Sequence, residues 1–389
     1  MTPLVSELQE AWEQGFNVMS PQGTSLLVKL ALSCVTCDIP ASRKVCGFLS
    51  HNSTLGCNKC LKQFKVTFGD RTDYSGFDRE NWESRTFEQH QRSVSNIIKQ
   101  VTKTGIESAE SKHGVHYSIL LALPYFDPTR FTAIDSMHNR FLGTGKHIFS
   151  PWVERSVLTK QSLNELDAKA KLFCVPAGIG RLLLSISSCY GAFTASQWKN
   201  WITLYSPVLL KEFVPREHFR CWLLFVRACS LLCCNCIRRS DILSADMFLE
   251  QFCRQCELLN DCTSCTFNMH LHMHLKQAFL DYGPPHASWC FAFERYNDIL
   301  GSYHTNKRDV EPQVMKKFSQ NQAIHSLDLP LDEDFSMLLP EGYRQELKSD
   351  MHTDSLHLLH YVRSPVNRID MHFCIPKYYG NHSTTTIFL

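Results

Sequence analysis

Residues 26–38 read LLVKLALSCVTCD, an almost continuously apolar run that ends in an acidic residue. Such a run is typical of a β-strand buried on both faces of a sheet, although a helix remains an alternative for so short a stretch. Pro40 prevents the strand pairing from continuing. We therefore expect Asp38 at the carboxyl end of a central strand, where open α/β sheets place functional groups.

The residues on either side of this run predict a mixed organisation. Upstream, Thr2 can cap a helix that begins at Pro3 and ends near Gly15, a residue suited to the left-handed position after a helix. Downstream, residues 46–92 are punctuated by glycine and asparagine and predict an irregular segment. Helical periodicity then recurs in several stretches up to about residue 280, so we expect most of the chain to be helical.

Composition and charge exclude several classes of protein. Forty Lys and Arg against 38 Asp and Glu give a formal charge of +2 over 389 residues, so any contact with DNA must come from local basic patches. The most apolar stretch, CWLLFVRACSLLCCNC, is interrupted by Arg227 and is too short to span a membrane. The first residues resemble no signal peptide, and we therefore interpret the 18 Cys as reduced thiols that favour metal binding over disulfides.

Cysteine pairs with two intervening residues are the first candidate ligands, because each can present two thiolates to one tetrahedral Zn²⁺. Such pairs include Cys34/Cys37, Cys57/Cys60, Cys253/Cys256 and Cys262/Cys265. The motif GCNKC places the second pair in a polar turn, the usual setting of a zinc ligand pair. The first pair lies in the apolar run, where small buried thiols are the favoured interpretation. The last two pairs form a four-Cys set by spacing alone, with little chain between them for a zinc module.

The segment NMHLHMHL, residues 268–275, is the one dense imidazole cluster in the sequence. His270 and His274 are one helical turn apart and project from the same face, whereas His272 points elsewhere. Together with Cys57 and Cys60 they predict a Cys2His2 zinc site that closes a loop of 274 − 57 = 217 residues. Ordinary core or surface histidines are the alternative.

Glu294 and Asp135 are two acidic residues that could have either a functional or a structural role. Glu294 follows His274 by twenty residues in SWCFAFERYNDILG, and it either pairs with a neighbour such as Arg295 or is held for a metal ion. Asp135 and His138 share a helical face in TAIDSMHNRFLGTGKH. Because an Asp at that spacing commonly caps a helix, we favour a structural role for Asp135.

Several ordered motifs together resemble the transposases of CACTA (En/Spm-like) elements over roughly residues 4 to 320, and more remotely the catalytic core of the V(D)J recombinase subunit and Transib transposases. The motifs are CDIPASRKVCGFLSHNSTLGCNKC, DYSGFDR, YFDPTRFTAIDSMHNRFLGTGKH, FTASQWKNW, CTFNMHLHMHL and FERYNDILGSYHTNKRDVEPQVM. The resemblance implies an α/β ribonuclease H-like core, incomplete at its N-terminus, with a large and mainly α-helical insertion and a predominantly helical chain overall.

The resemblance implies a division of the chain into five segments. Residues 1–45 would form the partial core, with its helix and central strand, and residues 46–92 the zinc-binding segment. Residues 93–275 would form the helical insertion, residues 276–318 would contain the closing catalytic helix, and residues 319–389 would form an irregular extension.

The resemblance also implies roles for individual residues. Asp38 matches the second of three catalytic acids and Glu294 the last, both as ligands of Mg²⁺ or Mn²⁺; Cys57, Cys60, His270 and His274 match the structural zinc ligands. Asp135 and His138 match a shared stretch of the insertion and are expected to be structural. A rival alignment makes Asp38 and Asp135 the first and second acids. The expected phosphate contacts are Arg43, Lys44, Arg295, Lys307 and Arg308.

The implied activity is metal-dependent cleavage at element ends followed by strand transfer into target DNA. DNA would be the partner, with a homodimer as the assembly, the nucleus as the location and no membrane involved. The first catalytic Asp of the family lies upstream of the region where Met1 falls, so we expect this chain to be inactive. The alternative is a non-catalytic, zinc-stabilised DNA- or protein-binding scaffold. A thiol redox protein is disfavoured, because no Cys pair opens a helix of a βαβ unit.

Overall fold

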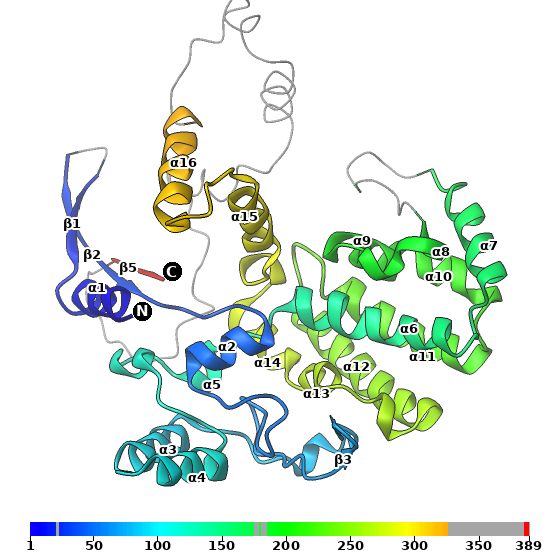
Figure 1. Cartoon of the computed structure of the whole chain (residues 1–389), viewed down its shortest axis with the longest axis horizontal. Coiled ribbons are helices and arrows are strands. Elements are labelled where there is room, and N and C mark those ends of the chain that lie inside the picture. Colours follow the sequence, from blue (N-terminus) through cyan, green and yellow to red (C-terminus); the bar gives the residue numbers. More distant parts are fainter. Residues whose placement is uncertain (21–22, 175–178, 180–184, 326–384, 389) are drawn as a thin grey trace, which may run out of the picture. The chain divides into compact units, whose positions relative to one another are not determined.

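The computed structural model describes residues 1–20, 23–174, 179, 185–325 and 385–388. The chain divides into two units, one of Met1–Phe291 with Tyr379–Leu389 and the other of Ala292–Tyr378. Among the described residues, helices predominate and the strands form two small sheets (Figure 1), which confirms the expected helical character.

The α-helices are α1 (Thr2–Glu13), α2 (Ile39–Cys46), α3 (Phe87–Ile98), α4 (Lys103–His113), α5 (Pro128–Phe131), α6 (Lys146–Glu154), α7 (Lys160–Ala170), α8 (Ile186–Cys189), α9 (Ala195–Asn200), α10 (Ser206–Leu209), α11 (Arg216–Leu231), α12 (Arg239–Asn260), α13 (Phe267–His272), α14 (Leu275–Tyr282), α15 (Phe291–Ser302) and α16 (Val310–His325). The 3₁₀ and π turns are η1 (Arg79–Asn81), η2 (Ile119–Ala122), η3 (Met137–Gly145), η5 (Tyr190–Ala192), η6 (Trp201–Tyr205), η7 (Leu210–Glu212), η8 (Cys262–Ser264) and η9 (Pro285–Ala287). The strands are β1 (Phe16–Met19), β2 (Ser25–Ala31), β3 (Thr67–Phe68), β4 (Arg71–Thr72) and β5 (Thr385–Phe388).

The first sheet has the order β1-β2-β5, with β1 antiparallel and β5 parallel to β2. The expectation that residues 26–38 form a strand buried on both faces is wrong. Strand β2 ends at Ala31, and Leu26 and Leu27 are 46% and 45% exposed. Within β2 only Val28 and Ala31 are buried, so an apolar sequence here lies at a largely exposed hairpin.

Asp38 begins a helix instead of ending a strand. After Ala31 the chain makes only an isolated parallel bridge between Val35 and Thr132 before α2 starts. The Asp38 carboxylate accepts a 2.7 Å hydrogen bond from the Ala41 N–H. An acidic cap followed by a proline in the first turn is a strong helix start, and this local preference determines the conformation at Asp38.

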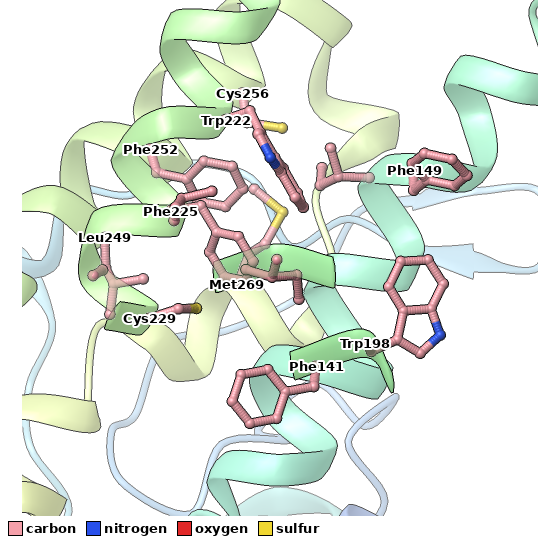
Figure 2. Close-up of a cluster of buried hydrophobic side chains, with 14 of the residues drawn as sticks. Phe141, Phe149, Trp198, Trp222, Phe225, Cys229, Leu249, Phe252, Cys256 and Met269 are labelled. Atoms are coloured by element: carbon pink, nitrogen blue, oxygen red, sulfur yellow. The ribbon is translucent and has the colours of Figure 1, made fainter. Parts of the chain in front are cut away.

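The main hydrophobic core lies around the antiparallel pair α11 and α12. Figure 2 shows Phe225 of α11 against Phe252 of α12, and their ring centroids are 5.0 Å apart. Trp222 packs edge-on against Trp152 at 5.6 Å. Cys256 is buried in the same cluster, which agrees with a packing role for a cysteine on this helix.

Between α2 and α3 the chain is largely irregular, with only the short strands β3 and β4 and the turn η1. Because such a segment has few backbone partners of its own, other groups must satisfy its carbonyls. An ion-pair network supplies one anchor: Arg79 of η1 binds Asp246 of α12 through two hydrogen bonds of 2.6 and 2.9 Å. The segment is thereby attached to the helical core.

In the second unit, α15 and α16 pack against each other through Tyr296 and Phe318, whose ring centroids are 6.5 Å apart. Glu294 lies in the first turn of α15. Of the expected extension 319–389, residues 319–325 belong to α16 and residues 385–388 form β5; residues 326–384 and 389 lie outside the described residues.

Candidate metal centre

The turn at residues 56–60 presents two buried sulfur atoms. Cys57 and Cys60 are both inaccessible to solvent, and the Lys59 N–H donates a 3.3 Å hydrogen bond to Sγ of Cys57. A backbone amide directed at the sulfur stabilises its thiolate form. With two residues between the cysteines, both sulfur atoms lie inside the protein within 4.8 Å of each other.

Two imidazoles reach the same point from α13 and its C-terminus. His270 is fully buried within α13, and His274 follows one turn later, at the start of α14. Thr266 caps α13 by accepting the Met269 N–H. This cap and the one-turn spacing explain why both rings lie on one side.

The four side chains that the sequence analysis grouped come together in the structure. Sγ of Cys60 lies 3.5 Å from Nε2 of His270, and Sγ of Cys57 lies 3.6 Å from Nε2 of His274. All four candidate ligand atoms are within 4.8 Å of one another. Tetrahedral zinc with Zn–S of about 2.3 Å and Zn–N of about 2.0–2.1 Å requires sulfur and nitrogen about 3.5 Å apart. The arrangement therefore can hold a metal ion.

The protonation of the cluster also suits metal binding. Burial lowers the pKa of His270 to about 4, so its ring is neutral and able to act as a ligand. Burial opposes ionisation of Cys57, but the hydrogen bond from Cys60 and the adjacent histidines hold its pKa well below the usual value. The hydrogen bond to Cys57 and burial raise the pKa of Cys60. A bound cation favours deprotonation of both thiols.

Aromatic side chains enclose the imidazoles. Trp82 stacks on His270 with 4.5 Å between the ring centroids, and Phe64 meets the same ring edge-on at 5.0 Å. Lys62 lies over the Trp82 ring, 4.5 Å from its centroid, and donates hydrogen bonds to the carbonyls of Ser75 and Gly76. These contacts fix the ring positions and exclude water from the ligand atoms.

Two arginines hold the backbone of the ligand turn. Arg85 donates to the carbonyls of Cys57, His113 and Leu55 at 2.7, 3.1 and 3.0 Å. Arg43 donates to the carbonyl of Gly56 and, at 3.2 Å, to that of Leu49. Both guanidinium groups therefore replace the backbone partners that the irregular segment lacks.

The expected role of Arg43 as a phosphate contact is corrected by this geometry. The residue is 4% exposed, and its guanidinium group is directed into the ligand turn. Lys44, its neighbour on α2, is exposed. Arg295, Lys307 and Arg308 are exposed in the second unit.

The two expected catalytic acids lie on different units. Asp38 is an exposed helix cap in the first unit, and Glu294 is exposed on α15 in the second. The other cysteine pairs form no metal group within 4.8 Å among the described residues. Sγ of Cys253 instead donates to the Met269 carbonyl at 3.6 Å, a contact between packed helices.

Asp135 caps the turn that follows it, as expected from its spacing. Its carboxylate accepts hydrogen bonds from the backbone N–H groups of Met137 and His138 at 3.3 and 2.9 Å. It also forms a hydrogen bond of 2.6 Å with Nδ1 of the His138 ring. Sequence reasoning missed Cys290, whose N–H donates to Asp135 at 2.8 Å across 155 residues. A lone cysteine in an aromatic stretch gave no signal of this contact.

No protein-family model and no curated protein matches this sequence. Within the described part of the chain, none of the helices has the length and apolar character needed to cross a bilayer.

Proposed function

We propose that this chain is a transposase-derived, DNA-binding nuclear protein stabilised by a structural zinc ion. The observation that carries the proposal is the meeting of Cys57 with His274 and of Cys60 with His270. This is the ligand set that the resemblance to CACTA transposases implies, and it joins parts of the chain 217 residues apart.

The chemistry of the ligand set favours a structural role for the ion. Two thiolates and two imidazoles fill a tetrahedral coordination shell and leave no position for a substrate or an activated water molecule. The ion would pin the irregular segment to α13, so that its binding free energy contributes directly to folding.

The exposed basic residues support DNA as the partner. Lys44, Arg295, Lys307 and Arg308 remain candidates for phosphate contacts, because all four side chains are exposed. With a net charge of only +2, such local contacts would supply the affinity and its dependence on salt.

A non-catalytic scaffold is the form of this function that we favour. Two-metal phosphoryl transfer needs carboxylates that bridge ions about 3.5–4 Å apart, whereas the Asp38 carboxylate caps α2. Metal-dependent DNA cleavage on a ribonuclease H-like core is the second candidate, favoured by the retention of Asp38 and Glu294 in the motifs that resemble the transposases.

DNA binding is tested by the fluorescence anisotropy of a labelled duplex at graded salt concentrations. We expect Arg295→Ala/Lys307→Ala/Arg308→Ala to reduce the slope of log K against log salt by up to about 2.7, that is, about 0.9 for each phosphate that these side chains would neutralise. The control Lys112→Ala/Lys160→Ala/Lys171→Ala makes the same charge change at other exposed positions. Equal decreases in both variants, or no binding by the parent chain, would contradict a specific DNA-binding surface.

The choice between scaffold and nuclease is tested with supercoiled plasmid and Mg²⁺ or Mn²⁺. The scaffold predicts no nicking above that of the Glu294→Gln variant. Metal-dependent nicking that Glu294→Gln and Asp38→Asn both abolish would establish the second candidate.

A further inference from the structure

A second group of ligand-type side chains lies apart from the Cys2His2 centre. Asp135, His138 and Cys290 bring a carboxylate oxygen, a ring nitrogen and a sulfur within 4.8 Å of one another. Asp135 and Cys290 are each 4% exposed, whereas the side chain of His138 is 24% exposed and gives the group a side open to solvent.

Backbone amides orient the carboxylate of this group. Oδ1 of Asp135 accepts the Cys290 N–H at 2.8 Å, and Oδ2 accepts the His138 N–H at 2.9 Å. Backbone N–H groups that donate to a ligating carboxylate hold it in a fixed orientation in this way. The amide of Cys290 also brings that residue's own sulfur next to the carboxylate.

A small cavity adjoins the group. Asp135 and His138, but not Cys290, line it together with Cys37, and its volume is about 20 Å³. A volume of about 10–15 Å³ accommodates one water molecule, so this space fits one water ligand on the Asp135 and His138 side of the group.

We propose that Asp135, His138 and Cys290 bind a second divalent transition metal of the zinc or cobalt class. One carboxylate, one imidazole and one thiolate form a mixed set of hard and soft donors that suits these ions and disfavours Mg²⁺ and Ca²⁺. Three protein ligands leave the fourth tetrahedral position to water, unlike the filled Cys2His2 centre.

Metal binding changes the protons of this group. Nδ1 of His138 and Oδ2 of Asp135 lie 2.6 Å apart and share one proton. An oxygen and a nitrogen that bind the same zinc ion stand about 3.3 Å apart. Metal binding would therefore separate these two atoms and release their shared proton to solvent. Burial raises the pKa of the Cys290 thiol to about 12. The ion itself must therefore displace the thiol proton, as coordinating cations do.

The proposal is tested by cobalt titration of the metal-free full chain, followed by absorption spectroscopy. The first equivalent should fill the Cys2His2 centre, and the second should add about half as much thiolate-to-cobalt charge-transfer absorbance, because one thiolate replaces two. We expect Cys290→Ser and Asp135→Asn to bind one equivalent fewer than the parent chain.

Cys234→Ser is the matched control, since Cys234 is exposed and belongs to neither group. It should retain both equivalents. The proposal is overturned if the parent chain binds one equivalent only, or if the second equivalent is lost in Cys234→Ser and retained in Cys290→Ser. A parent chain that binds one equivalent only overturns the proposal even where a variant fails to fold.

Discussion

Sγ of Cys57 lies 3.6 Å from Nε2 of His274, although 217 residues separate them in the sequence. Cys57 belongs to an irregular segment with few backbone partners, whereas His274 joins two helices of the core. A metal ion at this point would therefore hold together two regions that differ in their own stability.

Cys57→Ala should lower the zinc content by one equivalent and destabilise the fold. At free zinc about 1,000 times its dissociation constant, binding to the folded state alone contributes about 4 kcal/mol, and this contribution disappears with the site. Metal analysis and thermal unfolding at fixed free zinc measure the two effects. Cys189→Ala removes an exposed cysteine and should change neither. A zinc content in Cys57→Ala equal to that of the parent chain would rule out the Cys2His2 centre.

Arg85→Lys should destabilise the protein although the charge is unchanged. The guanidinium group satisfies three carbonyls in different directions, and a single ammonium group cannot reach all of them. An unsatisfied buried carbonyl costs about 1–3 kcal/mol, so we expect a decrease of about 2–4 kcal/mol in the free energy of unfolding.

Denaturant unfolding of Arg85→Lys and Arg92→Lys gives the comparison for this prediction. Arg92 is exposed on α3, the helix that directly follows Arg85, and its replacement should have an effect within about 0.5 kcal/mol. Similar stability of both variants would mean that Arg85 does not hold the ligand turn.

The candidate metal ligands could be predicted from the sequence because both halves of the set are local signals. Two cysteines in a polar turn and two histidines one helical turn apart have a fixed geometry wherever they lie in the chain. Their pairing came from the number of ligands that zinc requires and from the ordered motifs. Cys290 lacked any such signal, because its partner Asp135 lies 155 residues away.

The exposure of β2 and the role of Arg43 could not be predicted, because each depends on how other parts of the chain pack against it. The run containing Leu26 and Leu27 has the composition of a buried strand, but burial requires cover on both faces. Arg43 has the charge of a phosphate contact, yet the carbonyls of Leu49 and Gly56 surround its guanidinium group once the irregular segment has folded. In both cases tertiary packing, and not the local sequence, determines whether the side chain is exposed or buried.

Asp246→Ala should weaken the attachment of the irregular segment to α12. The Asp246 side chain is 4% exposed and binds Arg79 through two hydrogen bonds, with Lys276 at 3.7 Å. Breaking a buried ion pair by removing one partner costs about 3–5 kcal/mol. We expect a cost near the lower end, since Arg79 keeps its contact with Glu250 at 2.7 Å.

Glu217→Ala is the matched control for that ion pair. Glu217 and Arg220 form an exposed pair on α11, worth at most about 0.5 kcal/mol. Chemical denaturation should therefore distinguish the two variants clearly. An Asp246→Ala protein as stable as Glu217→Ala would show that the segment is held by other contacts.

His90 should make the fold sensitive to mild acid. Its ring is buried on α3, 5.0 Å from the Phe48 ring, and among the described residues neither ring nitrogen has a hydrogen-bond partner. Burial, with smaller contributions from Arg85 and His116, lowers its pKa from 6.5 to about 4. The unfolded chain therefore binds a proton at a higher pH than the folded chain does.

The contribution of the neutral His90 ring to the free energy of unfolding is consequently fully present above about pH 6.5, and it declines as the pH falls toward 4. At pH 5 the decrease amounts to about 2 kcal/mol, from 1.36 kcal/mol per pH unit. His90→Phe removes this decrease, so its free energy of unfolding relative to the parent should rise by about 2 kcal/mol between pH 7.5 and pH 5. Zinc release in acid affects both proteins and cancels in the difference. His304→Phe, at an exposed position, should show no such trend, and a pH-independent difference for His90→Phe would contradict the buried, neutral ring.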